Sequence, residues 1–488
     1  MARMDRREFI GMAAGAAALP SCAAPKAAKG REPAKGRLLR FGVLSDVHIS
    51  LYSNSQQSYQ AVHLEKALRW FDAQGVDAVV FPGDMIHSGI VSEMEIFAKV
   101  WHLVFPGGRG SDGRTVEKVL VTGNHEIAMW QSRIDHLGQR EWDEKEGLAL
   151  RIEETWGRLF GEKYEKVFMK MIKGVTFVGA QFHSCKPPVE EFFRDHADDL
   201  PKDRPFFYVQ HAHPANTCYG FAKTACDHGE STRALSPFPW AVALTGHSHT
   251  PLTDDRSVWQ GAFTSIGCGS AWNAGDNYPE GHDNATQFNK PQYNNARMES
   301  VWKFRDGYDS GRSCMLVDVY PDHLDIARRS IDFAEPLGPD WRVPLPAMPG
   351  GPFDFARGAR ETKPPEFEKD AYITFFPGWK YALHPKIGRR LRDKPYVGLM
   401  FPTATAGEGR VYDYVVEASV GGKTLAVSKL LTESQPFPTR LLQVGEACLF
   451  GRDELVEGVD IDIAITPRNC YGVSGRPLKT VVRLPPKT

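Results

Sequence analysis

The sequence has no excess of charge of either sign. Its 59 lysine and arginine residues are balanced by 60 aspartate and glutamate residues, so the formal net charge is −1. A chain with this balance makes no electrostatic case for binding nucleic acid or an anionic membrane surface. The sequence also lacks internal repeats, coiled-coil heptads and, beyond its first residues, any apolar run of about 20 residues, which a membrane-spanning helix would need.

Composition and length favour two globular domains. The hydrophobic content of 42% and the charged content of 24% are ordinary for a globular protein, and 488 residues are too many for one ordinary domain. The stretch 344–365 is rich in Pro, Gly and charge, which predicts a boundary. The predicted segments are an N-terminal segment 1–22, a tether 23–37, a first domain 38–340, a linker 341–368 and a C-terminal domain 369–488.

The N-terminal segment has three features in order: Arg6-Arg7, a short Ala- and Gly-rich apolar stretch over 11–19, and Pro20-Ser21-Cys22-Ala23. This order resembles a bacterial twin-arginine export signal, and residues 19–22 resemble the cleavage box of a lipoprotein with Cys22 as the acylated residue. The resemblance implies an exported protein of the periplasm or cell envelope, which touches the membrane only through a lipid anchor at Cys22. The alternative is an unstructured start with chance arginines.

The sequence has eight cysteines and no C-x-x-C pair, so nothing in it resembles a zinc knuckle. Export would permit disulfides. Without Cys22 an odd number of cysteines remains, which leaves at least one thiol unpaired within the chain. Proximity favours Cys218 and Cys226 as a pair.

Polar residues follow the predicted buried strands of the first domain, at the point where each strand ends. Open α/β sheets place their sites at the carboxyl ends of parallel strands. The strands are predicted, from their apolar runs, over 38–44, 76–81, 118–122, 204–210 and 240–245, with helices over 58–74 and 93–105. The side chains predicted to meet at the strand ends are Asp46, His48, Asp84, Asn124, His125, His211, His213, His247 and His249.

The stretch Gly246-His247-Ser248-His249 joins two imidazoles to the end of a strand. On an extended segment, residues i and i+2 point the same way, so both histidines would face one site. We expect Gly246 to let the chain turn where the strand ends. Neutral imidazole is the commonest metal ligand among side chains. For this pair alone, the alternative is two solvated histidines in a polar turn.

Taken in chain order, these blocks resemble a known family over roughly residues 38–335. The five blocks of the calcineurin-like metallophosphoesterases are matched by Asp46-x-His48, Gly83-Asp84, Gly123-Asn124-His125-Glu126, His211 and Gly246-His247-x-His249. The resemblance implies an α/β fold, namely a sandwich of two mixed sheets flanked by helices.

The resemblance also implies two divalent metal ions that share Asp84. One ion would be held by Asp46, His48, Asp84 and His249, and the other by Asp84, Asn124, His211 and His247. Mixed carboxylate and imidazole ligands suit Mn, Fe, Co or Zn. His125 would not be a ligand, because in the family the equivalent histidine protonates the leaving oxygen or stabilises the developing charge. The alternative for His125 is a core histidine.

Two such ions about 3.5–4 Å apart clamp the attacking and leaving oxygens of an in-line displacement at phosphorus, and a hydroxide that bridges them is the implied nucleophile. The charge remaining after the carboxylates and hydroxide are counted is positive, which favours a small anionic phosphoester as substrate. The predicted function is hydrolysis of phosphate monoesters or diesters. The alternatives are a nucleotidase or nucleotide phosphodiesterase of the same family, and a non-catalytic surface-binding protein on this scaffold.

The sequence departs from the family pattern at His87, where the family usually has Asp in Gly-Asp-x-x-Asp. Purple acid phosphatases carry a ligand tyrosine in this slot, and protein serine/threonine phosphatases carry arginines near the second and third blocks, so neither subclass is favoured. His87 is expected to contact substrate or to act as an outer-shell group, with a direct metal role as the alternative. His213 would contact substrate or replace His211 as a ligand.

A long polar insert over 270–302 follows the last block. Aromatic loops beside a site are suited to stacking on a base or sugar ring, and the alternative is that they cover apolar surface. The aromatic residues of the insert are Trp272, Tyr278, Phe288, Tyr293 and Trp302.

The C-terminal domain is predicted to be an all-β sandwich. Alternating apolar and polar residues predict strands over 371–376, 411–418, 424–427 and 459–465. The stretch 469–477 weakly resembles the closing hairpin of a fibronectin type III domain.

Overall fold

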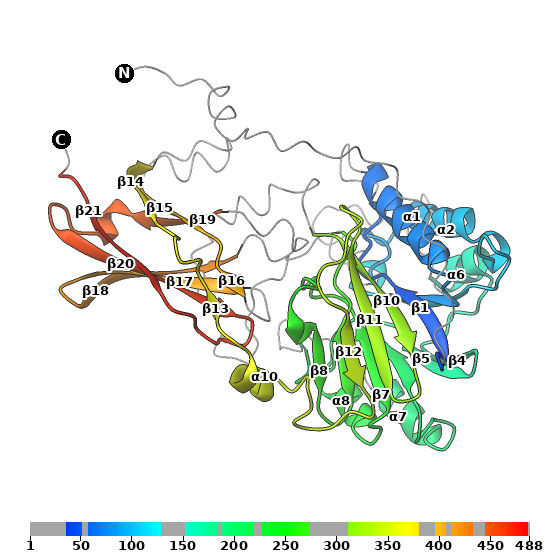
Figure 1. Ribbon diagram of the computed structural model, residues 1–488. Coiled ribbons are helices and arrows are strands. Elements are labelled where there is room, and N and C mark those ends of the chain that lie inside the picture. Colours follow the sequence, from blue (N-terminus) through cyan, green and yellow to red (C-terminus); the bar gives the residue numbers. More distant parts are fainter. Residues whose placement is uncertain are drawn as a thin grey trace. The chain divides into compact units, whose positions relative to one another are not determined.

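Figure 1 shows the computed structural model of the chain. The structure describes residues 36–50, 57–127, 152–182, 187–218, 227–272, 311–379, 396–406, 411–432 and 445–486. The predicted export signal with Cys22, and the predicted insert after Trp272, lie outside these residues. Within the described ranges, no helix is both long and apolar enough to cross a membrane.

The first sheet combines parallel and antiparallel strands. Its strands are β1 (Leu39–Val43), β2 (Ala78–Pro82), β3 (Glu117–Val121), β10 (Ser313–Val319), β11 (His323–Ser330) and β12 (Trp341–Pro344). The order across the sheet is β12-β11-β10-β1-β2-β3. Strands β1, β2 and β3 are parallel, whereas β10, β11 and β12 join on in antiparallel pairs.

Strands β1 and β2 are buried on both faces, as expected for central parallel strands, whereas β11 and β12 alternate buried residues with partly exposed ones. Val80 of β2 faces the core between the two sheets, whereas its neighbours Val79 and Phe81 face the helices. The covering helices are α1 (Gln57–Ala73), α2 (Val91–Val104) and α6 (Ile152–Phe160), with the short 3₁₀ helix η2 (Pro106–Gly108) after α2. The unbroken apolar runs of the sequence are therefore those of strands buried on both sides.

The second sheet lies against the first through a shared core that includes Phe41, Phe177 and Phe207. Its strands are β4 (Val167–Ile172), β5 (Val175–Ala180), β6 (Phe206–Val209), β7 (Ala241–Thr245), β8 (Val258–Gln260) and β9 (Thr264–Gly267), in the order β4-β5-β6-β7-β9-β8. The central strands are parallel and the two edge strands are antiparallel. The helical elements of this part are α7 (Pro187–Asp195), α8 (Glu230–Leu235) and the 3₁₀ helix η3 (Asp255–Ser257).

The predicted sandwich of two mixed sheets flanked by helices is confirmed. The stretch 341–368, predicted as a linker, contains regular structure. Its first residues form β12, which pairs with β11, and it also contains α10 (Phe355–Glu361). A Pro-rich composition does not exclude an edge strand, because an edge strand tolerates Pro where no donor is needed.

The C-terminal region consists of antiparallel sheets, as predicted. A three-stranded sheet β14-β15-β19 and a four-stranded sheet β18-β17-β20-β21 share one apolar core, and β13 pairs with β16. The elements are β13 (Pro365–Glu366), β14 (Thr374–Trp379), β15 (Tyr396–Pro402), β16 (Thr405–Ala406), β17 (Val411–Val420), β18 (Lys423–Leu431), β19 (Gly445–Gly451), η6 (Arg452–Glu454), β20 (Asp460–Asn469) and β21 (Leu478–Arg483). The likeness to a fibronectin type III domain stays a prediction.

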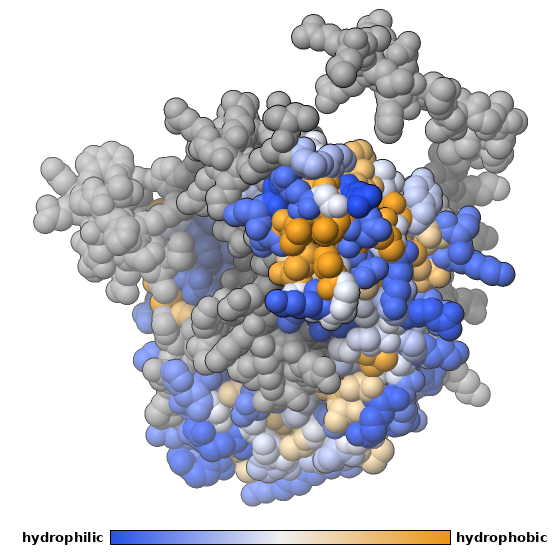
Figure 2. Space-filling model, turned by 90° about the vertical axis from the view of Figure 1, so that its left-hand side faces the viewer, coloured by the Kyte–Doolittle hydropathy of each residue, from blue (hydrophilic) through white to orange (hydrophobic). Residues whose placement is uncertain are grey.

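One face of the molecule carries a group of hydrophobic residues among mostly hydrophilic ones (Figure 2). Large apolar side chains that are exposed in the C-terminal region include Tyr372, Val427 and Val481. Exposed apolar residues are common on folded proteins, and these side chains by themselves do not identify a partner.

The structure does not bear out the expected pairing of Cys218 with Cys226. Cys218 is a buried free thiol whose sulfur lies 3.3 Å from the hydroxyl of Ser265. Burial raises the pKa of this thiol to about 12, so it stays protonated and unreactive at neutral pH. Cys218 packs into the interior, and Cys226 lies outside the described residues.

Candidate metal centre

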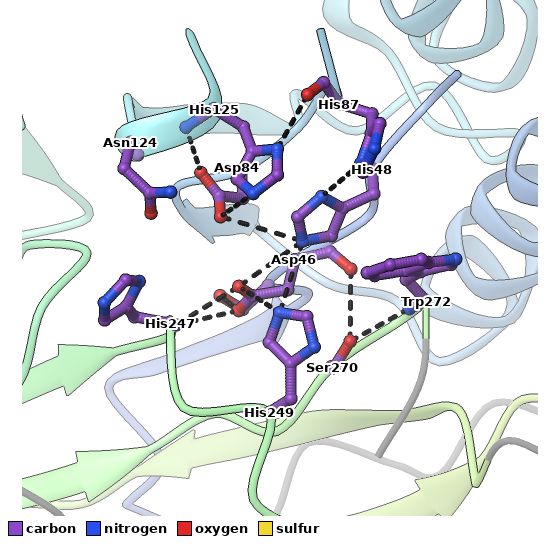
Figure 3. A network of polar contacts seen from close by, with 12 residues as sticks. Asp46, His48, Asp84, His87, Asn124, His125, His247, His249, Ser270 and Trp272 are labelled. Atoms are coloured by element: carbon purple, nitrogen blue, oxygen red, sulfur yellow. Dashed lines mark hydrogen bonds and ion pairs between the residues drawn. The ribbon is translucent and has the colours of Figure 1, made fainter. Parts of the chain in front are cut away.

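Segments from both sheets bring polar side chains to one place at the carboxyl ends of the strands (Figure 3). From the first sheet come Asp46 and His48 after β1, Asp84 after β2, and Asn124 and His125 at the start of α3 (Asn124–Ile127) after β3. From the second sheet come His211 after β6, and His247 and His249 after β7. The topology therefore gathers all the residues that the sequence predicted as ligands.

The backbone at five of these residues is left-handed. The φ angles are 54° at Asp46, 53° at His48, 51° at Asp84, 69° at His247 and 51° at His249. Such values are uncommon outside glycine, cost about 1–3 kcal/mol each and cluster at functional sites. The expectation that an extended segment aligns residues i and i+2 is therefore wrong. The two residues of each pair face one site because both have left-handed backbone after the strand ends.

The first group of converging side chains comprises Asp46, His48, Asp84 and His249, whose candidate ligand atoms all lie within 4.8 Å of one another. The Nε2 atom of His48 is 3.2 Å from that of His249 and 3.6 Å from an Asp84 oxygen. The Nε2 atom of His249 is 3.0 Å from Asp46. All four residues are buried. Two imidazoles and two carboxylates that converge in this way fit a borderline divalent cation.

The second group comprises Asp84, His211 and His247, again with ligand atoms within 4.8 Å. The Nε2 atom of His211 lies 3.1 Å from Asp84, 3.2 Å from His247 Nδ1 and 3.0 Å from the amide oxygen of Asn124. Because His211 Nδ1 donates to the Pro82 carbonyl at 2.8 Å, its Nε2 atom is left as the ligand atom. The side-chain amide oxygen of Asn124 would be a fourth ligand atom of this group.

Asp84 belongs to both groups, as a bridging carboxylate would. Its Oδ2 atom faces both His48 and His211, while Oδ1 accepts a hydrogen bond from the backbone N–H of His125 at 2.9 Å. Burial alone would raise the pKa of Asp84, but His211, His125 and His48 together outweigh it, and the pKa lies well below its usual value. The pKa of Asp46 is also low, because His249 outweighs burial there. Both carboxylates are therefore ionised and suited to cations.

His211 is cationic at neutral pH when no metal is bound. Burial lowers its pKa, but Asp84 outweighs burial and raises the pKa to about 9. Since a metal ligand must be a neutral imidazole, an ion that binds here displaces a proton. Metal affinity at this group should therefore increase with pH up to about 9.

His125 stands beside the first group without joining it. Its Nδ1–H donates to the backbone carbonyl of His87 at 2.7 Å, and its Nε2 atom lies 3.9 Å from Asp84. Burial, followed by His48, lowers the pKa of His125 to about 4. The neutral form therefore dominates near pH 7 unless an anionic substrate raises this pKa. The position suits an interaction with a substrate oxygen near Asp84.

His213, predicted as a substrate contact or alternative ligand, lies in neither group. Its Nδ1 atom is 2.6 Å from the Thr245 hydroxyl and its Nε2 atom is 2.9 Å from the Ser248 hydroxyl. The residue is buried, and burial lowers its pKa to about 3. His211, not His213, reaches the second group, and His213 instead contacts the loop that carries His247 and His249.

Glu126, to which the sequence analysis gave no role of its own, holds the backbone beside the candidate ligands. Its buried carboxylate accepts backbone N–H groups from Gly123 at 2.6 Å, Ile86 at 2.9 Å and Asp84 at 3.1 Å. Burial and the nearby Asp84 raise its pKa to about 8. Glu126 thereby ties the end of β2 to the end of β3. Its place directly after His125 was the available signal.

Glycines next to the ligands are required for close approach. A Cβ atom on Gly246 would lie 2.0 Å from the Ser45 hydroxyl and 2.4 Å from an Asp46 oxygen, and one on Gly83 would lie 2.4 Å from His211 Nδ1. Gly246 was expected to allow a turn, but it is absent from the residues with positive φ. It provides space, and the turn occurs at His247.

Trp272, the described aromatic residue of the predicted insert, lies beside the first group (Figure 3). Its ring centroid is 4.6 Å from that of His48 and 5.8 Å from that of His249. Its backbone N–H donates to Ser270 Oγ at 3.1 Å, and Ser270 in turn donates to the Asp46 carbonyl at 3.3 Å. The aromatic ring therefore covers one side of the candidate ligands.

Part of the chain matches a known protein family. Residues 39–251 match the family described as calcineurin-like phosphoesterase. Among solved structures, a dimetal phosphatase from Danio rerio is 10% identical, with 63% of this chain and 99% of that chain covered at a TM-score of 0.33. A purple acid phosphatase from yellow lupin is 11% identical, with 63% of this chain and 53% of that chain covered at a TM-score of 0.37. No curated protein matches the chain.

The family match ends just after His249, so it contains both groups of candidate ligands and His125. Residues 39–251 therefore have the motif order and the fold of the calcineurin-like phosphoesterases.

Proposed function

We propose that this protein is a divalent-metal-dependent phosphoesterase that hydrolyses small phosphate monoesters or diesters. The observation that carries the proposal is the pair of ligand groups, buried except for the partly exposed His247, that share Asp84 at the carboxyl ends of strands from both sheets. A single structural ion needs one closed set of ligands. Two sets that share one carboxylate are the arrangement expected for a two-metal hydrolase.

Two bound ions would supply Lewis acidity, which polarises phosphoryl oxygens and makes water a usable nucleophile near neutral pH. The residues that would hold them are Asp46, His48, Asp84 and His249 for one ion, and Asp84, Asn124, His211 and His247 for the other. This donor set suits Mn, Fe, Co or Zn.

The chain's own contribution to the reaction centres on His125. Its Nδ1–H is held by the His87 carbonyl, so Nε2 is the atom directed to the site. An anionic phosphoester beside Nε2 would raise the pKa of His125, and the imidazolium could then donate its Nε2 proton to the leaving oxygen. Trp272 packs against the His48 ring, and Ser270 donates a hydrogen bond to the Asp46 carbonyl.

The test is turnover by purified protein that has been stripped of metal and reloaded with Mn, Fe, Co or Zn separately. We expect hydrolysis of aryl phosphate monoesters or diesters that depends on reloading. Nucleotide, sugar-phosphate and phospholipid panels would then separate a nucleotidase or nucleotide phosphodiesterase from a broader phosphoesterase. Protein that binds two ions per chain but hydrolyses none of these compounds would instead be a surface-binding protein on this scaffold.

We further propose that the protein is exported to the periplasm or cell envelope and anchored by a lipid at Cys22. The support is the order of Arg6-Arg7, the apolar stretch and Cys22 in the sequence. Replacing Arg6-Arg7 with Lys-Lys should leave precursor in the cytoplasm, and Cys22→Ser should release the protein from membrane fractions. Fractionation and immunoblotting measure both. Unchanged processing and membrane attachment in the two variants would contradict the proposal.

A further inference from the structure

His87 contacts both a candidate ligand and the candidate acid (Figure 3). Its ring Nδ1 atom is 3.3 Å from Nδ1 of His48. Its backbone carbonyl accepts the Nδ1–H of His125 at 2.7 Å. The His87 side chain is thus placed behind His48, on the side opposite to the one that faces the carboxylates.

The protonation of His48 follows from its place in the first group. Its Nε2 atom faces Asp46, Asp84 and His249, and an imidazole can bind a metal only through an unprotonated nitrogen. The single proton of neutral His48 must then be on Nδ1. This N–H points at His87 Nδ1, which is an acceptor when His87 carries its own proton on Nε2.

The ring of His48 is also held by packing. His125 lies 4.3 Å away in an edge-to-face arrangement, and Trp272 lies 4.6 Å away in a tilted one. These contacts restrict the plane of the ring, but aromatic packing cannot select which nitrogen carries the proton. That selection requires a hydrogen-bond acceptor at Nδ1, and His87 Nδ1 lies there, 3.3 Å away.

We propose that His87 is a positioning residue that accepts the His48 Nδ1–H and thereby holds the Nε2 lone pair of His48 toward the first metal position. The inference rests on the proposed metal-dependent function and adds to it. Partners of this kind fix the tautomer and orientation of a ligating histidine, and losing one typically weakens metal binding by about 10- to 100-fold. The first ion, and not the second, should depend on His87.

The geometry also contains a competing arrangement. His48, His87 and His125 have ring nitrogens within 4.8 Å of one another and so form a third group that could hold an ion. An ion in this third group would either replace the first ion as the partner of His48 or require His48 to lose its Nδ1 proton as well. It would also occupy His125, the candidate acid. The hydrogen bond explains the 3.3 Å contact without either consequence.

The test compares His87→Phe with His87→Asn in the full chain. Phenylalanine keeps an aromatic ring against His48 and Trp272 but has no acceptor. Asparagine places its side-chain oxygen where Nδ1 of histidine stands, so it restores the hydrogen bond. We expect titration with Mn²⁺ or Zn²⁺ to give two ions per chain in the unmodified protein and in His87→Asn. In His87→Phe, one ion should bind about 10- to 100-fold more weakly and the other normally.

Double variants show which ion is affected. Adding His87→Phe to His48→Ala should cause no further loss of metal affinity, because the residue through which His87 acts is already gone. Adding it to His247→Ala should weaken the remaining ion by the full amount, because His247 belongs to the other group. A general loss of folding would reduce binding in both backgrounds, and circular dichroism of each variant measures folding directly.

Each other outcome overturns the inference. Normal binding of both ions by His87→Phe would remove the positioning role, while the proposed function would stand. A third ion in the unmodified protein that both variants lose would make His87 a direct ligand. A raised KM with unchanged metal content would make His87 a substrate contact. Failure of the unmodified protein to bind any metal would instead defeat the proposed function itself.

Discussion

Asp84→Asn should lose both metal ions, whereas His125→Ala should keep both. Asp84 faces both ligand groups through one oxygen, so the amide removes negative charge from two cation positions at once. His125 contacts Asp84 through its backbone N–H, and its ring packs against His48, but its Nε2 atom is 3.9 Å from Asp84 and belongs to neither ligand group. Metal analysis after dialysis should therefore give about two ions per chain for His125→Ala and fewer than one for Asp84→Asn.

The two variants should also differ in catalysis. Asp84→Asn should lower kcat by more than about 10³-fold, because metal ions contribute several kcal/mol of transition-state stabilisation. His125→Ala should lower kcat by about 10²- to 10⁴-fold for poor leaving groups such as alkoxides, which need a proton. The loss should be smallest for nitrophenolate, which leaves unaided. A leaving-group series measured beside metal content tests both expectations.

The effect of His125 should depend on pH in one direction. Its pKa is lowered to about 4, so the donating imidazolium becomes rarer as pH rises. The rate advantage of the unmodified protein over His125→Ala should therefore shrink toward alkaline pH. His102→Ala, at an exposed histidine of α2, is the matched control and should match the unmodified protein throughout. Metal loss in His125→Ala would make it a ligand, and equal losses across all leaving groups would indicate electrostatic stabilisation instead.

Gly123→Ala should inactivate the protein through a single methyl group. A Cβ atom there would lie 2.1 Å from Oδ1 and 2.6 Å from the backbone nitrogen of Asp84. Because backbone is involved, rotation of a side chain cannot relieve the overlap. Asp84 must move, and overpacking of this kind costs about 1–3 kcal/mol of unfolding free energy. A displacement near 1 Å at a reacting centre costs about 10²-fold in rate.

Thermal unfolding, metal content and kcat of Gly123→Ala measure these effects. Gly378→Ala is the control, because a Cβ atom on Gly378 in β14 meets nothing within 4 Å. It should bind two ions and retain activity. If Gly123→Ala behaved like Gly378→Ala, the tight approach of β3 to Asp84 would not be needed to hold the ligands.

Much of the fold was predictable because its signals are local. The apolar run of β2 and the helical spacing of α1 each depend on residues close together in sequence. A polar residue directly after a buried strand is likewise a local pattern. The carboxyl ends of parallel strands meet at one edge, so the gathering of Asp46, Asp84 and Asn124 followed from strand order alone. Periodicity therefore predicted the individual strands and helices, whereas the two-sheet fold and the ligand set were implied by the family resemblance.

Other features depended on contacts between distant segments. Whether His211 or His213 reaches the site was decided by the hydroxyls of Thr245 and Ser248, which engage His213 from another loop. The roles of Glu126 and His87 rest on hydrogen bonds to residues about 40 positions away. No local propensity encodes such pairings.

The sequence by itself determined which residue types follow each strand and in what order. Apolar runs and family motifs consist of residues that are close together in the chain, so they can be recognised without the fold. Only the tertiary structure decided how those residues face one another. The left-handed turns at Asp46, His48 and Asp84 oppose the local preference of these residues. They persist because hydrogen bonds between strand ends, such as His48 N–H to the Asp84 carbonyl, hold them in place. Those bonds exist only once the strands lie side by side.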